Sequence, residues 1–193
     1  GHVRIYEWNG VAWVQRGNDI DGEAAGNYSG ESVSLSSDGS MIAIGASGNG
    51  SKGHVRIYEW NGTTWVQKGN DIDGEATFDY SGRSVSLSSS GSIVAIGAPR
   101  NDANGNWVSP DFGHVRIYEW NGVAWVQRGN DIDGESSDDY SGKSVSLSSD
   151  GTIVAIGGGV YYASGHVRIY EWNGSTWLQK GNDIDGEAGF DNS

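Results

Sequence analysis

The stretch GHVRIYEWNG, residues 1–10, decides the fold because it occurs four times in the chain. Its copies start at residues 1, 53, 113 and 165, so successive starts lie 52, 60 and 52 residues apart. A second stretch, SGxSVSLSSxG, starts at Ser29, Ser81 and Ser141. Self-similarity at a roughly constant period of this size is the signature of a repeat architecture. The 193 residues therefore hold about three and a half units.

These two stretches divide the chain into a half unit and three full units. The half unit covers residues 1–28, and the full units cover 29–80, 81–140 and 141–193. The chain opens and closes inside the repeat pattern. Because repeats bury their faces against neighbouring repeats, we expect it to be part of a longer protein with further units.

Each unit predicts four short strands, which we name A to D. Strand A is Ser84–Ser88, strand B is Ile93–Ala98, strand C is His54–Trp60 and strand D is Trp65–Lys68. These runs are rich in β-branched and aromatic residues and are bounded by Gly, Asn, Asp and Ser, as strands are. No stretch of the sequence shows apolar residues at helical spacing over ~11 or more positions.

The connections between these strands predict a four-stranded antiparallel meander. Asn61-Gly62 joins strands C and D, and Asn-Gly supplies the positive φ angles of a tight hairpin turn. Ser89-Ser90-Gly91 joins strands A and B and is also too short for anything but a hairpin. The A–B and C–D turns then lie at one edge of the sheet. The B–C and D–A loops lie at the other edge, where the variable residues are.

The side chains become larger from strand A to strand D. Strands A and B carry Ser, Val, Ala, Gly and Ile, whereas strands C and D carry Tyr58, Trp60 and Trp65. Small residues suit strands that crowd around an axis, so the unit is shaped like the blade of a β-propeller. The predicted fold is all-β, with four-stranded blades of about 52–60 residues in a ring that protects the sheet edges.

Composition excludes several classes of protein. The formal net charge of −13 argues against nucleic acid, which needs a basic face. The absence of Cys excludes disulfides and thiolate metal sites, and no apolar run reaches the ~20 residues of a membrane helix. The sequence has no GxSxG nucleophile elbow, and its paired carboxylates recur alike in every unit. We therefore interpret the chain as a non-enzymatic protein.

The run from Tyr80 to Pro99, YSGRSVSLSSSGSIVAIGAP, resembles the FG-GAP type of β-propeller repeat. Gly97-Ala98-Pro99 matches the end of that family's strand B, and Gly53-His54-Val55 matches its following Gly-x-Val strand. Ser81-Gly82 stands where the family has Phe-Gly. The resemblance covers every unit and is closest to secreted bacterial and algal relatives with DIDGEA and SVSLSSDG repeats. It implies a propeller, usually seven-bladed, that is secreted or on the cell surface and serves adhesion or recognition.

Calcium is the candidate ion, and no cofactor is required. The family's calcium loop between strands A and B is reduced here to SSDG or SSSG, which has no room for six to eight oxygen ligands. The D–A loops instead repeat NDIDGE, which concentrates the oxygen ligands that Ca²⁺ favours. The alternative is an Asp side chain that caps its own turn before Gly. The candidate ligands are Asp19, Asp21, Glu23, Asp71, Asp73, Glu75, Asp131, Asp133, Glu135, Asp183, Asp185 and Glu187.

Aromatic residues in the B–C loops are the candidate ligand-binding residues. These loops, residues 47–52, 99–112 and 158–164, differ most between units. Loops are where binding residues concentrate, and aromatic side chains there stack on sugars or anchor protein partners. The alternative is that the rings fold back over the edge of the blade. The candidates are Trp107, Phe112, Tyr161 and Tyr162.

Two other sets of residues recur with the repeat. His2, His54, His114 and His166 each open a strand C in a different unit, so they cannot converge on one metal and we expect a structural role. Four Asn residues begin glycosylation sequons, which would carry glycans in a secreted eukaryotic protein. At two of these sites the hairpin turn already demands the Asn-Gly pair. The sequon residues are Asn27, Asn49, Asn61 and Asn173.

Two functions follow from this pattern. The first is an extracellular or cell-surface module for recognition or adhesion, which binds a carbohydrate or protein through the B–C and D–A loops. The alternative is a structural cell-surface or filament-forming protein whose similar units self-associate. Neither function involves nucleic acid or membrane insertion.

Overall fold

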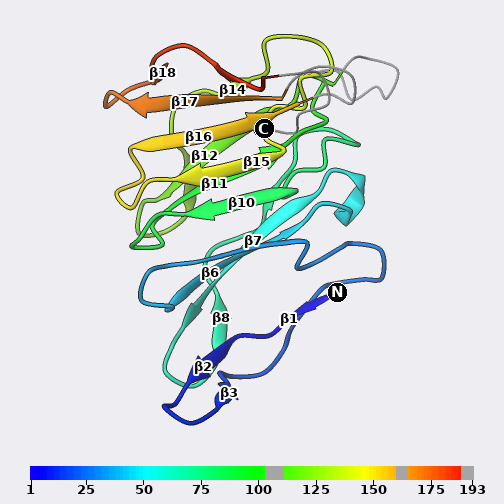
Figure 1. Ribbon diagram of the computed structural model, residues 1–193. Helices are drawn as coiled ribbons and strands as arrows, with labels where there is room; N and C mark the ends of the chain where they lie inside the picture. Colours follow the sequence, from blue (N-terminus) through cyan, green and yellow to red (C-terminus); the bar gives the residue numbers. More distant parts are fainter. Residues whose placement is uncertain (103–110, 160–164, 188–193) are drawn as a thin grey trace.

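A computed structural model describes residues 1–102, 111–159 and 165–187 (Figure 1). Three four-stranded antiparallel sheets, here called blades, follow one another along the chain, after a half unit made of two hairpin-like strand pairs. One short 3-10 turn, η1 (Asn49–Ser51), interrupts the described strands. None of the described helical residues forms a segment long and apolar enough to span a membrane.

The strands of each unit share the same order, A-B-C-D, and every blade adds a short fifth strand beside strand C. The half unit contains β1 (His2–Val3), β2 (Tyr6–Trp8), β3 (Trp13–Gln15) and β4 (Ile20–Asp21). The first blade contains β5 (Ser32–Leu35), β6 (Met41–Ala46), β7 (His54–Trp60), β8 (Trp65–Gln67) and β9 (Ile72–Asp73). The second contains β10 (Ser84–Leu87), β11 (Ile93–Ala98), β12 (His114–Trp120), β13 (Trp125–Gln127) and β14 (Ile132–Asp133). The third contains β15 (Ser144–Leu147), β16 (Ile153–Gly158), β17 (His166–Trp172), β18 (Trp177–Gln179) and β19 (Ile184–Asp185).

The register of the strands confirms the predicted meander and separates its two edges. In the first blade Ala46 pairs with His54, and His54 pairs with Asp73, so the B–C loop and the D–A loop lie at one edge, here called the loop edge. Trp60 pairs with Trp65, which places the C–D turn at the opposite edge, here called the turn edge. The A–B turn lies there too, because Met41 pairs with Glu59.

The fifth strand is an element that the sequence pattern does not predict. Residues of the NDIDGE loop, Ile72 and Asp73, pair with Val55 and His54 instead of forming an open loop. The reason is burial: the Ile72 side chain is only 6% exposed and packs into the core between two blades. Of the two aspartates that flank this isoleucine, Asp73 therefore lies in the strand and Asp71 directly before it.

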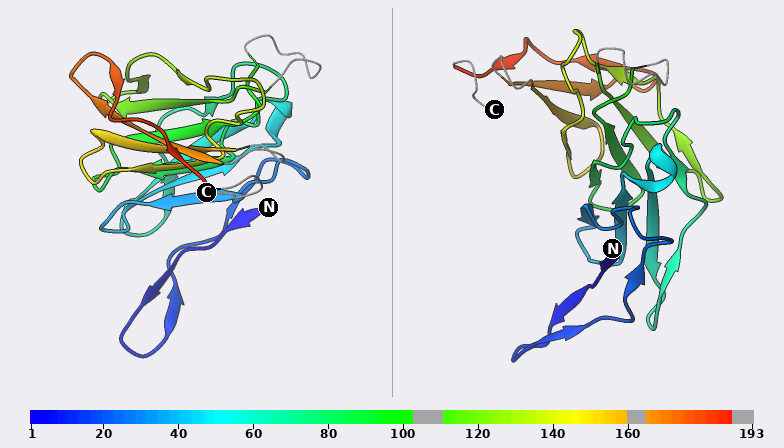
Figure 2. Two further views of the ribbon diagram at one scale, coloured as in Figure 1. Left: turned by 45° about the horizontal axis from the view of Figure 1, so that its top comes forward. Right: turned by 90° about the vertical axis from the view of Figure 1, so that its right-hand side faces the viewer.

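The hydrophobic core lies between blades and not within them. Alternate residues of strand B face opposite sides: Ile42 and Ile44 pack with Val3 of the half unit, whereas Met41 and Ala43 pack toward the next blade. Side chains alternate across a strand, so both faces of strand B are buried. The first and second blades thus each pack against two neighbours, and Figure 2 shows the sheets stacked along the chain with the β2–β3 hairpin projecting from one end.

Strands A of neighbouring blades approach closely, as the small residues of strands A and B predict. The Ser34 hydroxyl accepts a hydrogen bond of 2.9 Å from the amide of Leu87 in the next blade. A Cβ atom on Gly45 would lie 2.0 Å from the carbonyl oxygen of Gly82, a distance that no side chain tolerates. Glycine is therefore required where strand B of one blade meets the start of strand A of the next.

The A–B turns satisfy their own polar groups. The Asp38 carboxylate accepts hydrogen bonds from the Ser36 hydroxyl at 2.6 Å and from the Ser40 amide at 2.9 Å. These bonds lower the pKa of Asp38 to about 2, with the Ser36 hydroxyl as the largest cause. The turn is thus as short as the sequence predicts, and its carboxylate is engaged within the turn.

Leu87 and Leu35 occupy the same position in successive blades and test the inter-blade core. Leu87 is 7% exposed between two blades, whereas Leu35 is 49% exposed because it faces the half unit, which provides no strand A beside it. Leu87→Ala should lower the free energy of unfolding by about 2–5 kcal/mol, as buried leucines do, and Leu35→Ala by less than about 1 kcal/mol. Denaturant unfolding of both variants checks this, and equal losses would contradict a core between blades.

Candidate functional site

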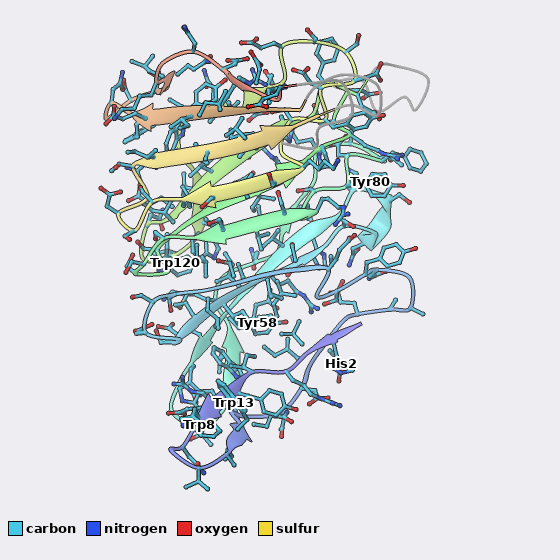
Figure 3. All side chains as sticks on the ribbon, viewed as in Figure 1. His2, Trp8, Trp13, Tyr58, Tyr80 and Trp120 are labelled. Atoms are coloured by element: carbon cyan, nitrogen blue, oxygen red, sulfur yellow. The ribbon has the colours of Figure 1, made fainter. Side chains whose placement is uncertain are left out.

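The loop edge carries a hollow of about 210 Å³ between the first and second blades. Residues of two D–A loops and two B–C loops line it, so its walls come from both blades. It has aromatic, acidic, basic and hydroxyl groups within one small space. Figure 3 shows Tyr80 at this edge and Trp120 at the opposite, turn edge. The lining residues are Tyr28, Glu31, Ser47, Tyr80, Arg83, Pro99 and Arg100.

The two tyrosines of the hollow have an unusual backbone conformation. Tyr28 and Tyr80 both have a φ of 56°, and Tyr140, at the same position of the next unit, has a φ of 49°. Side chains other than glycine rarely adopt this left-handed region, and such strain concentrates at functional sites. A turn hydrogen bond holds each one: the amide of Arg83, for example, donates to the carbonyl of Tyr80 at 3.1 Å. Tyr28 is 62% exposed, whereas Tyr80 is half-buried.

The charged groups of the hollow are paired across the blade junction. Arg83 of the second blade lies 2.9 Å from the Glu31 carboxylate of the first, and the Ser47 hydroxyl donates to the other oxygen of that carboxylate. The Arg100 guanidinium lies 5.1 Å from the centre of the Tyr80 ring, within cation–π range. The hollow therefore offers a ring to stack on, beside donors and an acceptor for hydroxyl groups.

The structure brings each buried histidine next to acidic residues of two units. The Nδ1 atom of His54 lies 3.6 Å from Asp71 of its own unit, and Glu23 of the preceding unit lies within the same group. In each of two such groups the ligand atoms all lie within 4.8 Å of one another. The groups are Glu23, His54 and Asp71, and Glu75, His114 and Asp131.

The histidines do not converge on one another, as the sequence predicts. Each of these two histidines instead lies close to two acidic residues, which the sequence analysis did not predict. The acidic partners come from the D–A loops on either side, so the signal lies in the spacing of His54 to both Glu23 and Asp71. Burial is the largest cause that lowers the pKa of His54, and it lowers the pKa of His114 to about 4. The imidazoles are therefore neutral at pH 7.

One imidazole with two carboxylates is a mixed nitrogen and oxygen set. Such a set suits Zn²⁺ or another transition metal better than Ca²⁺, which takes six to eight oxygen ligands. A cation here would compete with a resident positive charge, because Arg116 lies 3.4 Å from the Glu75 carboxylate. These residues could hold a metal, but the arginine also explains why the carboxylates gather there.

The remaining acidic candidates do not meet at a common centre in the part of the chain that the structure describes. The second aspartate of each NDIDGE loop lies in a two-residue strand, as Asp73 does in β9. The first aspartate of each loop accepts a hydrogen bond from a Gln side chain four residues earlier. These bonds are Gln15 to Asp19 at 2.7 Å, Gln67 to Asp71 at 2.6 Å, Gln127 to Asp131 at 2.5 Å and Gln179 to Asp183 at 2.6 Å.

Of the four aromatic candidates, the structure describes one. Phe112 is 37% exposed, and its carbonyl accepts a hydrogen bond of 3.0 Å from the Ser141 amide of the following D–A loop, at the loop edge. Trp107, Tyr161 and Tyr162 lie outside the described residues. Tyr28 and Tyr80 are not among the aromatic candidates of the sequence, because those candidates lie in the B–C loops and these two tyrosines lie in the D–A loops.

The four sequon residues lie in two different settings. Asn61 and Asn173 close the C–D turns: each side-chain oxygen accepts two backbone amides at 2.9 Å, from Thr63 and Thr64 in the case of Asn61. Asn49 donates to the Glu23 carboxylate at 2.7 Å, and the Asn27 carbonyl accepts the amide of Gly48 at 3.2 Å. Turn geometry alone therefore explains two of the four asparagines.

The buried imidazole of His114 predicts a loss of stability in mild acid. Its pKa in the folded chain, about 4, lies below the ~6.5 of an unfolded histidine, so the unfolded chain binds more protons between these values. Stability should fall as the pH drops from 6.5 toward 4, and His114→Asn should remove on the order of 2–3 kcal/mol of that fall. Denaturant unfolding at a series of pH values measures the slope.

The slope, not the stability at a single pH, is the readout, since removing a buried side chain lowers stability at every pH. His54, whose pKa is also lowered by burial, retains its share of the slope in the variant. Buried Asp79, whose pKa is raised mainly by burial, acts in the opposite direction and is unchanged. The exposed His2 supplies the control, His2→Asn. A His114→Asn variant with the wild-type slope would contradict this origin of the pH dependence.

Comparison with known proteins supports the fold. No protein-family model matches the sequence, and no curated protein does. Among solved structures, TolB from Acinetobacter baumannii aligns with a TM-score of 0.52 at 13% identity, over 92% of this chain and 37% of that one. A hypothetical selenium-binding protein from Sulfolobus tokodaii aligns with a TM-score of 0.52 at 14% identity, over 77% of this chain and 39% of that one.

The chain thus spans less than two fifths of the length of these two proteins. At such identity the likeness concerns the fold alone. Together with the repeated four-stranded antiparallel blades, the likeness to propeller-like structures shows that this chain is an all-β protein of the β-propeller type.

Proposed function

We propose that the chain is a non-enzymatic recognition module that binds a carbohydrate at the loop edge. The observation that carries this proposal is the hollow between the first two blades, where Tyr28 and Tyr80 stand beside Arg83 and Glu31. An aromatic ring offers an apolar face to the carbon–hydrogen side of a sugar ring. The nearby guanidinium, carboxylate and hydroxyl groups suit the sugar's own hydroxyl groups.

The volume of the hollow limits the size of the ligand that it can bind. At about 210 Å³ it is smaller than the ~300–1,000 Å³ of pockets for drug-sized molecules, so it suits one sugar unit of a glycan. The backbone strain at Tyr28 and Tyr80 supports a binding role, because both rings are held at the edge by a costly conformation. A protein ligand would need a wider contact than this hollow provides.

The proposed location is outside the cell or on its surface, as the FG-GAP resemblance implies. Secretion and adhesion go with that resemblance, and the net charge of −13 suits a soluble extracellular module. The alternative function is a structural repeat protein that self-associates. It draws on the near-identity of the units.

A glycan array with the purified 193-residue protein tests the recognition function. Tyr80→Ala should weaken binding to the preferred glycan at least tenfold, because it removes the ring on which the sugar stacks, while Tyr80→Phe should retain most of the affinity. Tyr140→Ala is the matched control, since Tyr140 has the same left-handed backbone but does not line the hollow. An array without reproducible binding, or equal losses in Tyr80→Ala and Tyr140→Ala, would contradict the proposal.

Binding should also persist in the presence of a chelator. The acidic groups with His54 and His114 are separate from the residues that line the hollow, so no metal is needed for a sugar to stack there. Adding EDTA should change the dissociation constant less than twofold. A large loss that Ca²⁺ restores would instead assign the NDIDGE loops to the binding site.

A further inference from the structure

The buried imidazole of His54 faces a carboxylate without a hydrogen bond to it. His54 is 2% exposed, and its Nε2 atom has no hydrogen-bond partner. Its Nδ1 atom lies 3.6 Å from Oδ2 of Asp71, which is too long for a hydrogen bond. Two ligands of one tetrahedral zinc ion, each ~2.0–2.1 Å from the metal, lie about 3.3 Å apart. The spacing of these two atoms is therefore closer to that of two ligands on one ion than to that of a bonded pair.

Both carboxylates of this group are held by neighbouring amide side chains. Gln67 donates to Oδ1 of Asp71 at 2.6 Å, so the other oxygen is the one that faces His54. Asn49 donates to Oε2 of Glu23 at 2.7 Å. Hydrogen bonds of this kind orient the side chains that bind a metal and fix their geometry. One ligand atom from each of the three side chains lies within 4.8 Å of the other two.

The fold brings the three side chains together from two units. Glu23 lies two residues after β4 of the half unit, and His54 opens β7 of the first blade. The pairing of β7 with β9 places Asp73 opposite His54, and Asp71 directly precedes β9. An ion bound by these side chains would therefore connect the half unit to the first blade.

The second group has the same three residue types, but an arginine already neutralises one of its carboxylates. The Arg116 guanidinium is 5% exposed and lies 3.4 Å from the Glu75 carboxylate. Its counterpart Arg56 makes the corresponding bond to a backbone carbonyl, that of Asp21 at 3.0 Å. The part of the chain that the structure describes contains no arginine or lysine paired with Glu23 or with the aspartate of the first group.

The charges around the two imidazoles differ in the same direction. Burial is the largest cause that lowers the pKa of His54, and among the charged neighbours Asp71 acts more strongly than Arg56. At His114 burial again lowers the pKa most, but there Arg116 acts more strongly than Asp131. The neutral imidazole, which is the form that binds a metal, thus lies in a more negative environment in the first group.

We propose that Glu23, His54 and Asp71 form a Zn²⁺ site that joins the half unit to the first blade. One imidazole nitrogen and two carboxylate oxygens are ligands that zinc accepts, whereas Ca²⁺ needs six to eight oxygen atoms. Three protein ligands leave the fourth tetrahedral position to a water molecule. The second group does not bind the ion, because Arg116 takes the place of its positive charge. The site shares no residue with the hollow, so the proposal does not depend on a bound sugar.

Isothermal titration of the 193-residue protein, without a polyhistidine tag, with ZnCl₂ alone tests the site. We expect one Zn²⁺ per chain. Glu23→Gln keeps the shape of an exposed side chain and removes its charge, so it should weaken binding at least about tenfold. Glu75→Gln is the matched control at the same position of the next unit and should bind Zn²⁺ as the wild type does. Zinc should raise the melting temperature of the wild type and of Glu75→Gln, and of Glu23→Gln much less, because it binds the folded chain.

Two further variants separate this site from other zinc-binding groups. His54→Gln should weaken binding at least as much as Glu23→Gln, with circular dichroism to establish that it is folded; if it is not, Glu23→Gln decides. His2→Asn removes an exposed histidine and should leave the affinity unchanged. The absence of binding, equal losses in Glu23→Gln and Glu75→Gln, or binding that is lost in His2→Asn would each overturn the proposal. So would Ca²⁺ that binds as tightly as Zn²⁺.

Discussion

The packing of each blade against its neighbours is the constraint on which the rest of the structure depends. A blade of four short strands has no interior of its own, because other units cover both faces of strand B in the first and second blades. The contact between Gly45 and the carbonyl of Gly82 fixes how closely the inner strands approach. The tryptophan bonds, such as Trp65 to the carbonyl of Arg16, fix the outer strands. Stability is thus a sum over junctions, as in other repeat proteins.

This rigid stack allows the loop edge to carry strain. Three tyrosines in left-handed conformations cost on the order of 1–3 kcal/mol each, and only a surrounding structure that fixes the backbone can hold them. Because the tyrosine recurs in each unit, it cannot by itself distinguish one junction from another. The B–C loops make that distinction: Pro99 and Arg100 reach the hollow between the first two blades, beside Ser47. A few loop residues therefore give a symmetrical scaffold one asymmetric site.

A feature could be predicted from the sequence when the residues that determine it are close together in the chain, and could not when they come from different units. Strand order was predictable because Asn61-Gly62 and the short A–B turns permit only hairpins, and both are local signals. The fifth strand was not predictable, because Ile72 pairs with strand C only where its side chain packs into a core that includes residues of the next blade. The groups around His54 and His114 were missed for a similar reason, since their acidic members come from two units. The left-handed backbone of Tyr80 could not be predicted, because tyrosine is not a residue type that usually adopts it.

The two edges of a junction perform different tasks. At the turn edge the contacts are aromatic, with the Arg16 guanidinium 4.9 Å from the centre of the Trp60 ring. Toward the loop edge they are polar and buried: Arg116 is 5% exposed and bonds to a carbonyl and a carboxylate of the preceding unit. Buried polar groups contribute little net stability but penalise a shifted register, because a displaced guanidinium would lose its partners. We infer that the aromatic edge supplies adhesion between units and the polar edge sets their alignment, which in turn fixes the hollow where a ligand is expected.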